Sequence, residues 1–327
     1  MEKDRNGILD ILRVLCSMFI IMIHTNNNNK LLFFCANTVG RLAVPIFMII
    51  TGYYYFRNPS SKKKKVTIKK LLWLWFVWQV VYIPRGILAV RNDSSLDILA
   101  KFLKGFVGSS IFYSGSWYLI ATVFGLIIVD KLRLKKHYYV MTSISLFILL
   151  FDLFSTNYMY VMPIGNSMSH IIEVVNPHST IITGVLWMSL SLFIANNINS
   201  LKKICNVVTL MTSFLLLVLE YCFVHYNNFY SINNDMYFTL PIVVVVLFVL
   251  LQKHTYTMAY RHSIYLRNLS SLVFFAHFGV ISLSKFINFQ KFSLALFIFV
   301  VILSFLVSMV TIKLSRFQRF KFIEYIY

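Results

Sequence analysis

An arginine and a histidine share one face of the first apolar stretch of the chain. Arg13 and His24 lie eleven positions apart in the segment from Asp10 to His24. At about 100° per residue, an α-helix would bring their side chains within roughly 20° of each other, ~16 Å apart along its axis. An arginine facing lipid is costly, so a cation and an imidazole on one stripe of a membrane helix indicate a functional site. The alternative is that Arg13 snorkels to the cytoplasmic interface and His24 merely ends the helix.

A second cation stands in the next apolar stretch. Arg41 precedes Pro45 by one turn, and a proline inside a helix removes a backbone donor and frees a carbonyl. A kinked helix with a buried cation could contact an anion or stabilise an oxyanion. The alternative is an interfacial arginine beside a proline that only packs.

Other polar and aromatic residues lie in or beside later apolar stretches. His277 is either a core histidine bonded to a neighbouring helix or a residue that positions a substrate or relays a proton. Glu220 near a membrane interior needs a buried arginine or histidine partner, and it could orient an imidazole or neutralise Arg41. Trp117 and Tyr118 suit an interfacial anchor or a platform for a sugar ring.

The composition predicts a membrane protein. Hydrophobic residues make up 58% of the 327 residues, charged residues make up 13%, and the mean hydropathy is +0.73. The net charge of +20 would suit nucleic acid, but the Lys and Arg residues cluster beside apolar runs. That distribution is typical of membrane topology and of contact with anionic lipid, so no nucleic acid partner is expected. The four cysteines form no CxxC pair, and neither a metal site nor a disulfide framework is predicted.

Ten apolar runs predict an all-α, polytopic membrane helical bundle that forms one domain over residues 1–327. If the N-terminus is cytoplasmic, the cytoplasmic segments hold 22 Lys and Arg residues and the outer segments hold seven. This bias places both termini in the cytoplasm and His24 toward the outer leaflet. The segment 94–107 is amphipathic and is expected to lie flat at the outer interface, before the longest outer loop at 157–178. The predicted spans lie at about 8–25, 38–56, 71–90, 116–131, 138–156, 179–197, 204–224, 237–252, 268–285 and 292–312.

Several motifs occur together along the chain. Arg13 is followed by His24, and Gly-Arg-Leu-Ala-Val-Pro occupies 40–45. A basic segment at 62–70 precedes Leu-Leu-Trp-Leu-Trp, Ser-Trp-Tyr-Leu occupies 116–119, and the segment 269–277 ends in a histidine. This combination resembles the acyltransferase 3 family of integral membrane acyltransferases over nearly the whole chain. The basic segment has lysines where the family usually has arginines, which weakens bidentate phosphate recognition there.

The resemblance implies transfer of an acyl group, usually acetyl, from cytoplasmic acyl-CoA to a hydroxyl of a cell-surface polysaccharide or a lipid-linked sugar. It implies that Arg13 and His24 are the essential pair. Arg13 would hold phosphate, and His24 near the thioester would act as a general base or as an acyl carrier. Acyl-CoA, with acetyl-CoA as the usual form, is then a donor substrate, and no permanently bound cofactor is expected. Residues expected to contribute to binding acyl-CoA or the acceptor are Arg41, Glu220, His277, Trp117, Tyr118, Lys69 and Lys70.

The richness in Ile, Asn, Lys and Phe indicates an AT-rich bacterial genome. This favours O-acetylation of capsule or cell-wall glycan at the cell membrane, beside polysaccharide-assembly proteins. Two other classes stay open. One is a transporter or exporter of a glycan or a small polar solute, although no internal repeat or pair of broken helices is visible. The other is a non-catalytic component of a polysaccharide assembly complex, which would not need Arg13 and His24.

Overall fold

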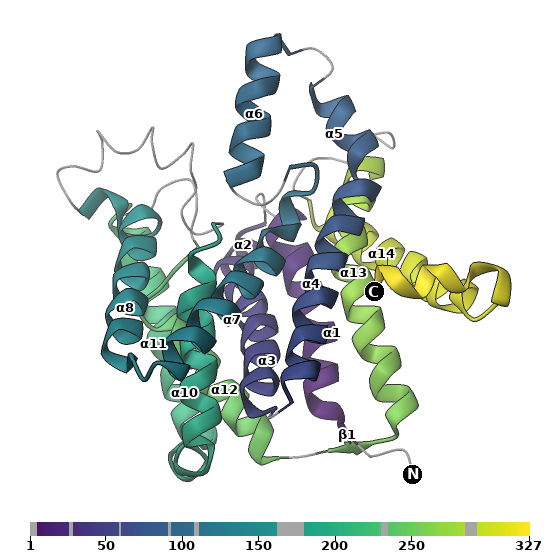
Figure 1. Cartoon of the computed structure of the whole chain (residues 1–327). Helices are drawn as coiled ribbons and strands as arrows, with labels where there is room; N and C mark the ends of the chain where they lie inside the picture. Colours follow the sequence, from purple (N-terminus) through teal and green to yellow (C-terminus); the bar gives the residue numbers. More distant parts are fainter. Residues whose placement is uncertain are drawn as a thin grey trace. The chain divides into compact units, whose positions relative to one another are not determined.

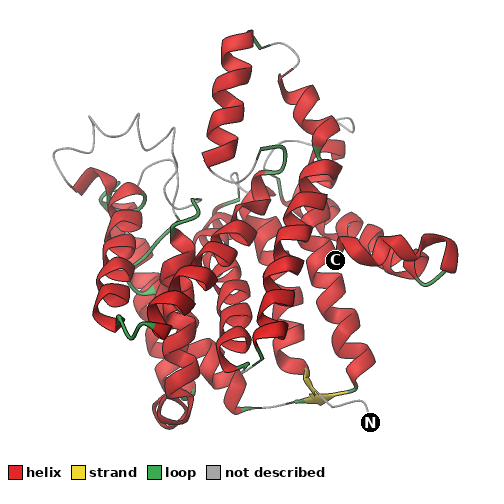
Figure 2. Cartoon of the chain, viewed as in Figure 1, coloured by secondary structure: helices red, strands yellow, loops and turns green. Residues whose placement is uncertain are grey.

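The computed structural model describes residues 5–25, 29–58, 60–90, 93–107, 111–161, 180–229, 235–254, 256–284 and 293–327. These residues are almost entirely helical (Figure 2), as the apolar runs predicted. The exception is a two-residue antiparallel ladder between β1 (Arg5–Asn6) and β2 (Thr257–Met258). Most of the predicted outer loop 157–178 lies outside the described residues, since residues 162–179 are not described.

Each predicted span contains a helix, and a helix also occupies the amphipathic segment at 94–107 (Figure 1). The α-helices are α1 (Gly7–Thr25), α2 (Lys30–Asn37), α3 (Ala43–Arg57), α4 (Ser61–Val81), α5 (Ile83–Val90), α6 (Ser95–Val107), α7 (Trp117–Leu134), α8 (Tyr138–Ser155), α10 (Thr183–Ile204), α11 (Val207–Tyr226), α12 (Leu240–Lys253), α13 (Tyr260–Ser284) and α14 (Leu294–Ser315). The short 3₁₀-helices are η1 (Gly40–Leu42), η2 (Ser114–Ser116), η3 (Met159–Val161) and η6 (Gln318–Ile326).

Several of these helices are long and apolar enough to cross a bilayer, so the chain is a multi-pass membrane protein. Among the described residues six segments meet that condition, and α12 is a shorter apolar helix. The number of ten spans and the cytoplasmic placement of both termini stay predictions. The six segments are Gly7–Thr25, Lys30–Arg57, Tyr138–Ser155, Val207–Tyr226, Tyr260–Ser284 and Leu294–Ser315.

The second predicted span is not one kinked helix, and that expectation was wrong. Helix α2 ends at Asn37, the 3₁₀-turn η1 follows, and α3 begins at Ala43. Pro45 lies in the first turn of α3, where a backbone N–H has no partner within the helix in any case. The proline therefore breaks no hydrogen bond inside a span, and Arg41 lies in η1 between the two helices.

The third predicted span, 71–90, is also two helices. Helix α4 begins at Ser61, ten residues earlier than predicted, because Ser60 caps it by accepting a hydrogen bond from the Lys63 amide. The basic segment 62–70 is therefore part of a helix. Helix α4 ends at Val81, and Pro84 stands in the first turn of α5, where proline is tolerated.

The described chain packs as two compact units, and each is described by itself. The first unit comprises Met1–Phe47 and Leu247–Tyr327. In it α13 packs along both α1 and α14. Cys16 and Ile21 of α1 are fully buried, as are Val273 of α13 and Val300 of α14. Van der Waals packing of these apolar side chains holds the three helices together.

The second unit comprises Met48–Val246, and its closest helix pair is α7 with α10. A Cβ added to Gly184 of α10 would collide with the backbone of Ala121 in α7. A Cβ added to Gly125 would collide with the Gly184 backbone. Close approach through small residues is a usual way for membrane helices to associate, because it maximises van der Waals contact between backbones.

Candidate active site

The N-terminal half of the predicted α1 stripe is tied to α13 through a carboxylate. Asp10 accepts a hydrogen bond from the Ser263 hydroxyl at 2.5 Å and forms an ion pair with Arg13, with Nη1 3.3 Å from Oδ1. Asp10 is only 7% exposed, and the Arg13 side chain is 17% exposed. A buried carboxylate needs such partners, because desolvation of the charge is otherwise uncompensated. Asp10 thus gives Arg13 a counter-ion and restricts the position of its guanidinium group.

The other end of the stripe is an aromatic cluster between α1 and α13. The His24 ring stacks on the His277 ring, with centroids 5.4 Å apart and planes 23° apart. The Phe278 ring contacts both imidazoles, with its centroid 4.5 Å from that of His24 and 4.4 Å from that of His277. His24 is exposed, whereas His277 is fully buried. The two histidines that the sequence nominated separately therefore lie in contact, one reachable and the other enclosed.

A backbone hydrogen bond fixes the orientation of the buried histidine. His277 Nδ1 lies 2.5 Å from the carbonyl oxygen of Phe274, one turn earlier in α13. A carbonyl only accepts, so Nδ1 carries a proton and donates it to this carbonyl. Phe274 also packs edge-on against Phe47 at 6.0 Å. His277 thus presents a ring of fixed orientation to His24.

Arg41 lies in η1 directly after Gly40, which packs against the end of α1 that carries His24. Its Nη2 donates to the Asn37 side chain at 2.8 Å, and its backbone amide donates to the Thr38 carbonyl. The preceding Gly40 lies so close to Ile23 that an added Cβ would approach to 3.0 Å. A larger residue at position 40 would push η1 away from the segment that ends in His24. Arg41 is half-buried in this position.

Glu220 is bonded differently from the expectation, and the predicted arginine or histidine partner was wrong. Its carboxylate accepts hydrogen bonds from the Tyr158 hydroxyl at 2.7 Å, the Phe238 amide at 2.6 Å, and the Thr239 amide and hydroxyl at 2.9 and 2.6 Å. The two amides immediately precede α12, so the carboxylate caps that helix from α11. Burial and the neighbouring carboxylate raise the pKa of Tyr158, which keeps its hydroxyl a donor.

The motif that contains Trp117 and Tyr118 is held by a glutamine that the sequence analysis did not single out. Gln79 of α4 is buried, and its amide donates to the Ser116 hydroxyl at 2.5 Å. Its oxygen accepts from the backbone amides of Phe112 and Tyr113, at 2.7 and 3.2 Å. In the sequence, Gln79 could have been singled out as a polar amide side chain flanked by tryptophans and valines.

The aromatic and basic residues of the second unit differ in exposure. Trp117 and Tyr118 are half-buried in the first turn of α7. Lys69 and Lys70 are exposed on α4. The first unit contains Arg13, His24, Arg41 and His277, while the second contains Glu220, Trp117, Tyr118 and the two lysines.

Metal chemistry has no candidate ligand set in the described ranges. No group of three or more His, Cys, Asp or Glu residues there could hold a metal ion. Cys16, Cys35, Cys205 and Cys222 form no disulfide bond.

A comparison with protein families agrees with a site made of an arginine and two histidines on packed membrane helices. The family model described as an acyltransferase domain, Acyl_transf_3, matches residues 6–313, nearly the whole chain. The chain therefore belongs to the acyltransferase 3 family, and the sequence resemblance is confirmed.

One curated relative has a different printed activity. The chain is 24% identical over 337 residues to a protein of Enterococcus faecalis named amino-acid racemase. The match covers 97% of this chain but 47% of the relative, so the chain spans about half the length of that protein. No solved structure matches the chain.

Proposed function

We propose that the protein is a membrane-bound O-acyltransferase that moves an acyl group from cytoplasmic acyl-CoA to a hydroxyl of a cell-surface or lipid-linked polysaccharide. Membership of the acyltransferase 3 family supports the acyl transfer. The observation that carries the proposal is the pair of imidazoles, in which exposed His24 rests on buried His277. The enzyme would lie in the cell membrane, and acetyl-CoA is the first donor to test.

The reaction needs a base because a sugar hydroxyl is a weak nucleophile at neutral pH. In the proposed step, His24 takes the hydroxyl proton while the hydroxyl oxygen attacks the thioester carbonyl. The carbon–sulfur bond then breaks, and His24 returns the proton to the leaving thiolate. The products are the ester and free coenzyme A. Positioned general bases typically contribute factors of about 10² to 10⁴ in rate.

The contacts of His24 suit this role. Stacking on His277 and a tilted contact with Phe278 restrict the ring to one region, which lowers the entropy cost of placing the base beside the substrate. Arg13 lies eleven residues earlier on the same helix, ~16 Å away along its axis. The flexible arm of coenzyme A could span that length, with a phosphate at Arg13 and the thioester near His24.

The test uses cells with and without the protein. NMR of the surface glycan should show ester signals that depend on the protein and disappear in His24→Ala. His24→Ala should be produced in the membrane at the normal level, since the exposed ring contributes little to the core. Retention of glycan esters in His24→Ala would overturn the assignment of the base, and the absence of ester from the glycan of both strains, with and without the wild-type protein, would overturn the proposed acceptor.

An acyl-carrier mechanism can be separated from general-base catalysis by trapping. If His24 carried the acyl group itself, incubation of the purified protein with radiolabelled acetyl-CoA would leave label on the denatured polypeptide. The general-base mechanism predicts no label without an acceptor. A transporter would move its solute without consuming the thioester in either assay.

A further inference from the structure

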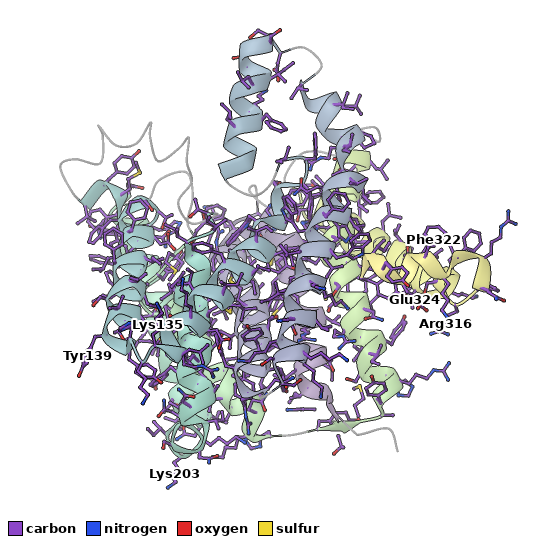
Figure 3. All side chains as sticks on the ribbon, in the orientation of Figure 1. Lys135, Tyr139, Lys203, Arg316, Phe322 and Glu324 are labelled. Atoms are coloured by element: carbon purple, nitrogen blue, oxygen red, sulfur yellow. The ribbon has the colours of Figure 1, made fainter. Side chains whose placement is uncertain are left out.

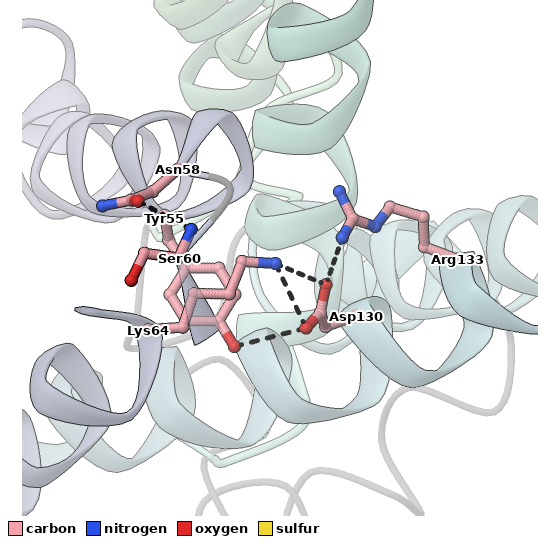
Figure 4. Close-up of polar contacts among 6 residues, drawn as sticks. All are labelled: Tyr55, Asn58, Ser60, Lys64, Asp130 and Arg133. Atoms are coloured by element: carbon pink, nitrogen blue, oxygen red, sulfur yellow. Dashed lines mark hydrogen bonds and ion pairs between the residues drawn. The ribbon is translucent and has the colours of Figure 1, made fainter. Parts of the chain in front are cut away.

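A carboxylate in the second unit is held between two cations where three helices meet. Asp130 Oδ1, near the end of α7, lies 3.1 Å from Lys64 Nζ and 2.9 Å from Arg133 Nη2. Its Oδ2 lies 3.4 Å from Lys64 and 3.5 Å from the Tyr55 hydroxyl of α3. Figure 4 shows these donors converging on the one carboxylate. We call the four residues, Tyr55, Lys64, Asp130 and Arg133, the Asp130 cluster.

Aromatic rings support both cations of the Asp130 cluster. Lys64 Nζ lies 4.9 Å from the centre of the Tyr55 ring, and Arg133 Cζ lies 5.8 Å from the centre of the Phe56 ring. The Lys64 and Arg133 side chains are 13% and 25% exposed. Cation–π contacts and partial burial hold the two charges in place more firmly than a surface pair would be held. The donors are therefore pre-arranged around one oxyanion position.

The charge around this position is unbalanced. Asp130 is the one acidic residue in the segments 57–81 and 117–140. Two cations of the cluster share its single negative charge, and the same segments contain nine further basic residues. Arg133 has five N–H donors, and among the described residues Asp130 is the acceptor that its guanidinium meets. The cluster can therefore accept more negative charge than Asp130 supplies. These further basic residues of the two segments are Arg57, Lys62, Lys63, Lys65, Lys69, Lys70, Lys131, Lys135 and Lys136.

We propose that the Asp130 cluster is a binding site for a phosphate group, with Asp130 standing in for the phosphate until the ligand arrives. A phosphate offers more negative charge and more acceptor oxygens than a carboxylate, and guanidinium and ammonium groups are its usual protein ligands. Asp130 keeps the cations in position without ligand and competes with the phosphate for them. The chemistry fits two sources, the phosphates of coenzyme A or an anionic lipid headgroup. Only the first of these rests on the proposed function.

The opposing explanation is that Asp130 only fastens α4 to α7. Both explanations expect Lys64→Gln and Arg133→Gln to be damaging, but they disagree about Asp130→Asn. A fastener loses stability when its charge is removed, and ligand affinity stays unchanged. A competing counter-ion weakens ligand binding, so its removal tightens binding.

The experiment uses the full-length protein in phosphatidylcholine nanodiscs, with coenzyme A titrated by calorimetry. Asp130→Asn should bind coenzyme A about fivefold tighter, because a negative charge within a few ångströms of the phosphate is lost and salt screens only part of that effect. Arg133→Gln should bind about tenfold more weakly. Lys135→Ala is the matched control, since Lys135 (labelled in Figure 3) is exposed and is not one of the four residues of the Asp130 cluster. This control also removes one positive charge, and affinity should change less than about twofold.

A second arm identifies the source of the phosphate. Nanodiscs containing phosphatidylglycerol replace the coenzyme A titration, and the thermal midpoint is compared between wild type and Asp130→Asn. A larger lipid-dependent rise in Asp130→Asn, with no response to coenzyme A, would assign the site to a lipid headgroup. That result would keep the proposed phosphate site while removing its link to the donor substrate.

The outcome that overturns the proposal is unchanged affinity of Asp130→Asn for both probes, whatever happens to its stability. Misfolding cannot imitate the expected result, because a misfolded variant would not bind more tightly. The test is also separate from the catalytic proposal. His24→Ala should retain coenzyme A affinity even where it forms no ester.

Discussion

Replacement of Glu220 by glutamine should destabilise the second unit, although the two side chains have nearly the same shape. Each carboxylate oxygen accepts one backbone amide, Phe238 on Oε1 and Thr239 on Oε2. Backbone amides cannot reverse their direction, so either orientation of the glutamine amide places an NH₂ group against one of them. The hydroxyls of Tyr158 and Thr239 can rotate and cannot repair this conflict.

The magnitude follows from the number of bonds. Hydrogen bonds to a charged group contribute about 1.5–3 kcal/mol each, and a donor left without an acceptor adds a desolvation cost of similar size. Glu220→Gln loses at least one backbone bond and the charge that strengthens the other three. Because Glu220 is only half-buried, the expected loss in the free energy of unfolding is about 2–4 kcal/mol. Tyr158→Phe removes a single bond and should cost about 1–2 kcal/mol.

The assay is reversible unfolding of the purified protein in mixed micelles of rising SDS content, followed by circular dichroism. The expected order of stability is wild type, then Tyr158→Phe, then Glu220→Gln. Equal stability of all three proteins would refute the capping role. Loss of glycan esters in Glu220→Gln without loss of stability would instead favour the sequence-based hypothesis that Glu220 orients an imidazole.

The remaining predictions concern other helix contacts. Asp10→Ala removes the counter-ion of Arg13 and should lower the free energy of unfolding by about 2–3 kcal/mol, whereas Ser263→Ala removes one hydrogen bond to the carboxylate and should lower it by about 1–2 kcal/mol. Both values are measured by the same SDS unfolding, and equal losses for the two variants would count against the ion pair between Asp10 and Arg13. Gly184→Ala drives a methyl group into the Ala121 backbone and should cost about 3 kcal/mol or more, seen as reduced yield and early unfolding, and a neutral result would show that α7 and α10 can separate without penalty.

Hydropathy and motifs predicted the parts of the fold that depend on local sequence. The apolar run 8–25 became α1 within a residue, since length and apolarity alone decide such a helix. Prediction of helix boundaries failed where caps or polar residues decide them. The cap at Ser60 starts α4 within a basic segment that hydropathy excludes from a span. Helix α13 begins at Tyr260 and extends through polar residues that a hydropathy threshold also excludes.

The candidate site shows the same division. Arg13 and His24 could be placed on one helix face because both lie on one element with a fixed period. The contact of His24 with His277 and the bond from Ser263 to Asp10 could not be predicted, because the latter pair is separated by 253 positions. The partners of Glu220 include two backbone amides, which are present at nearly every position and leave no pattern in a sequence.

Exposure separates the residue proposed to be reactive from two structural polar residues of this chain. Glu220 has four donors on two oxygens, and Gln79 uses both its oxygen and its amide nitrogen, so substrate could reach either group only by breaking bonds that hold helices together. The His24 side chain is exposed, and its ring stacks on the His277 ring and meets the Phe278 ring at an angle of 49°. A substrate can therefore approach His24 without breaking the bonds that hold Glu220 and Gln79. This accessibility makes His24, rather than Glu220, the residue to test first for chemistry.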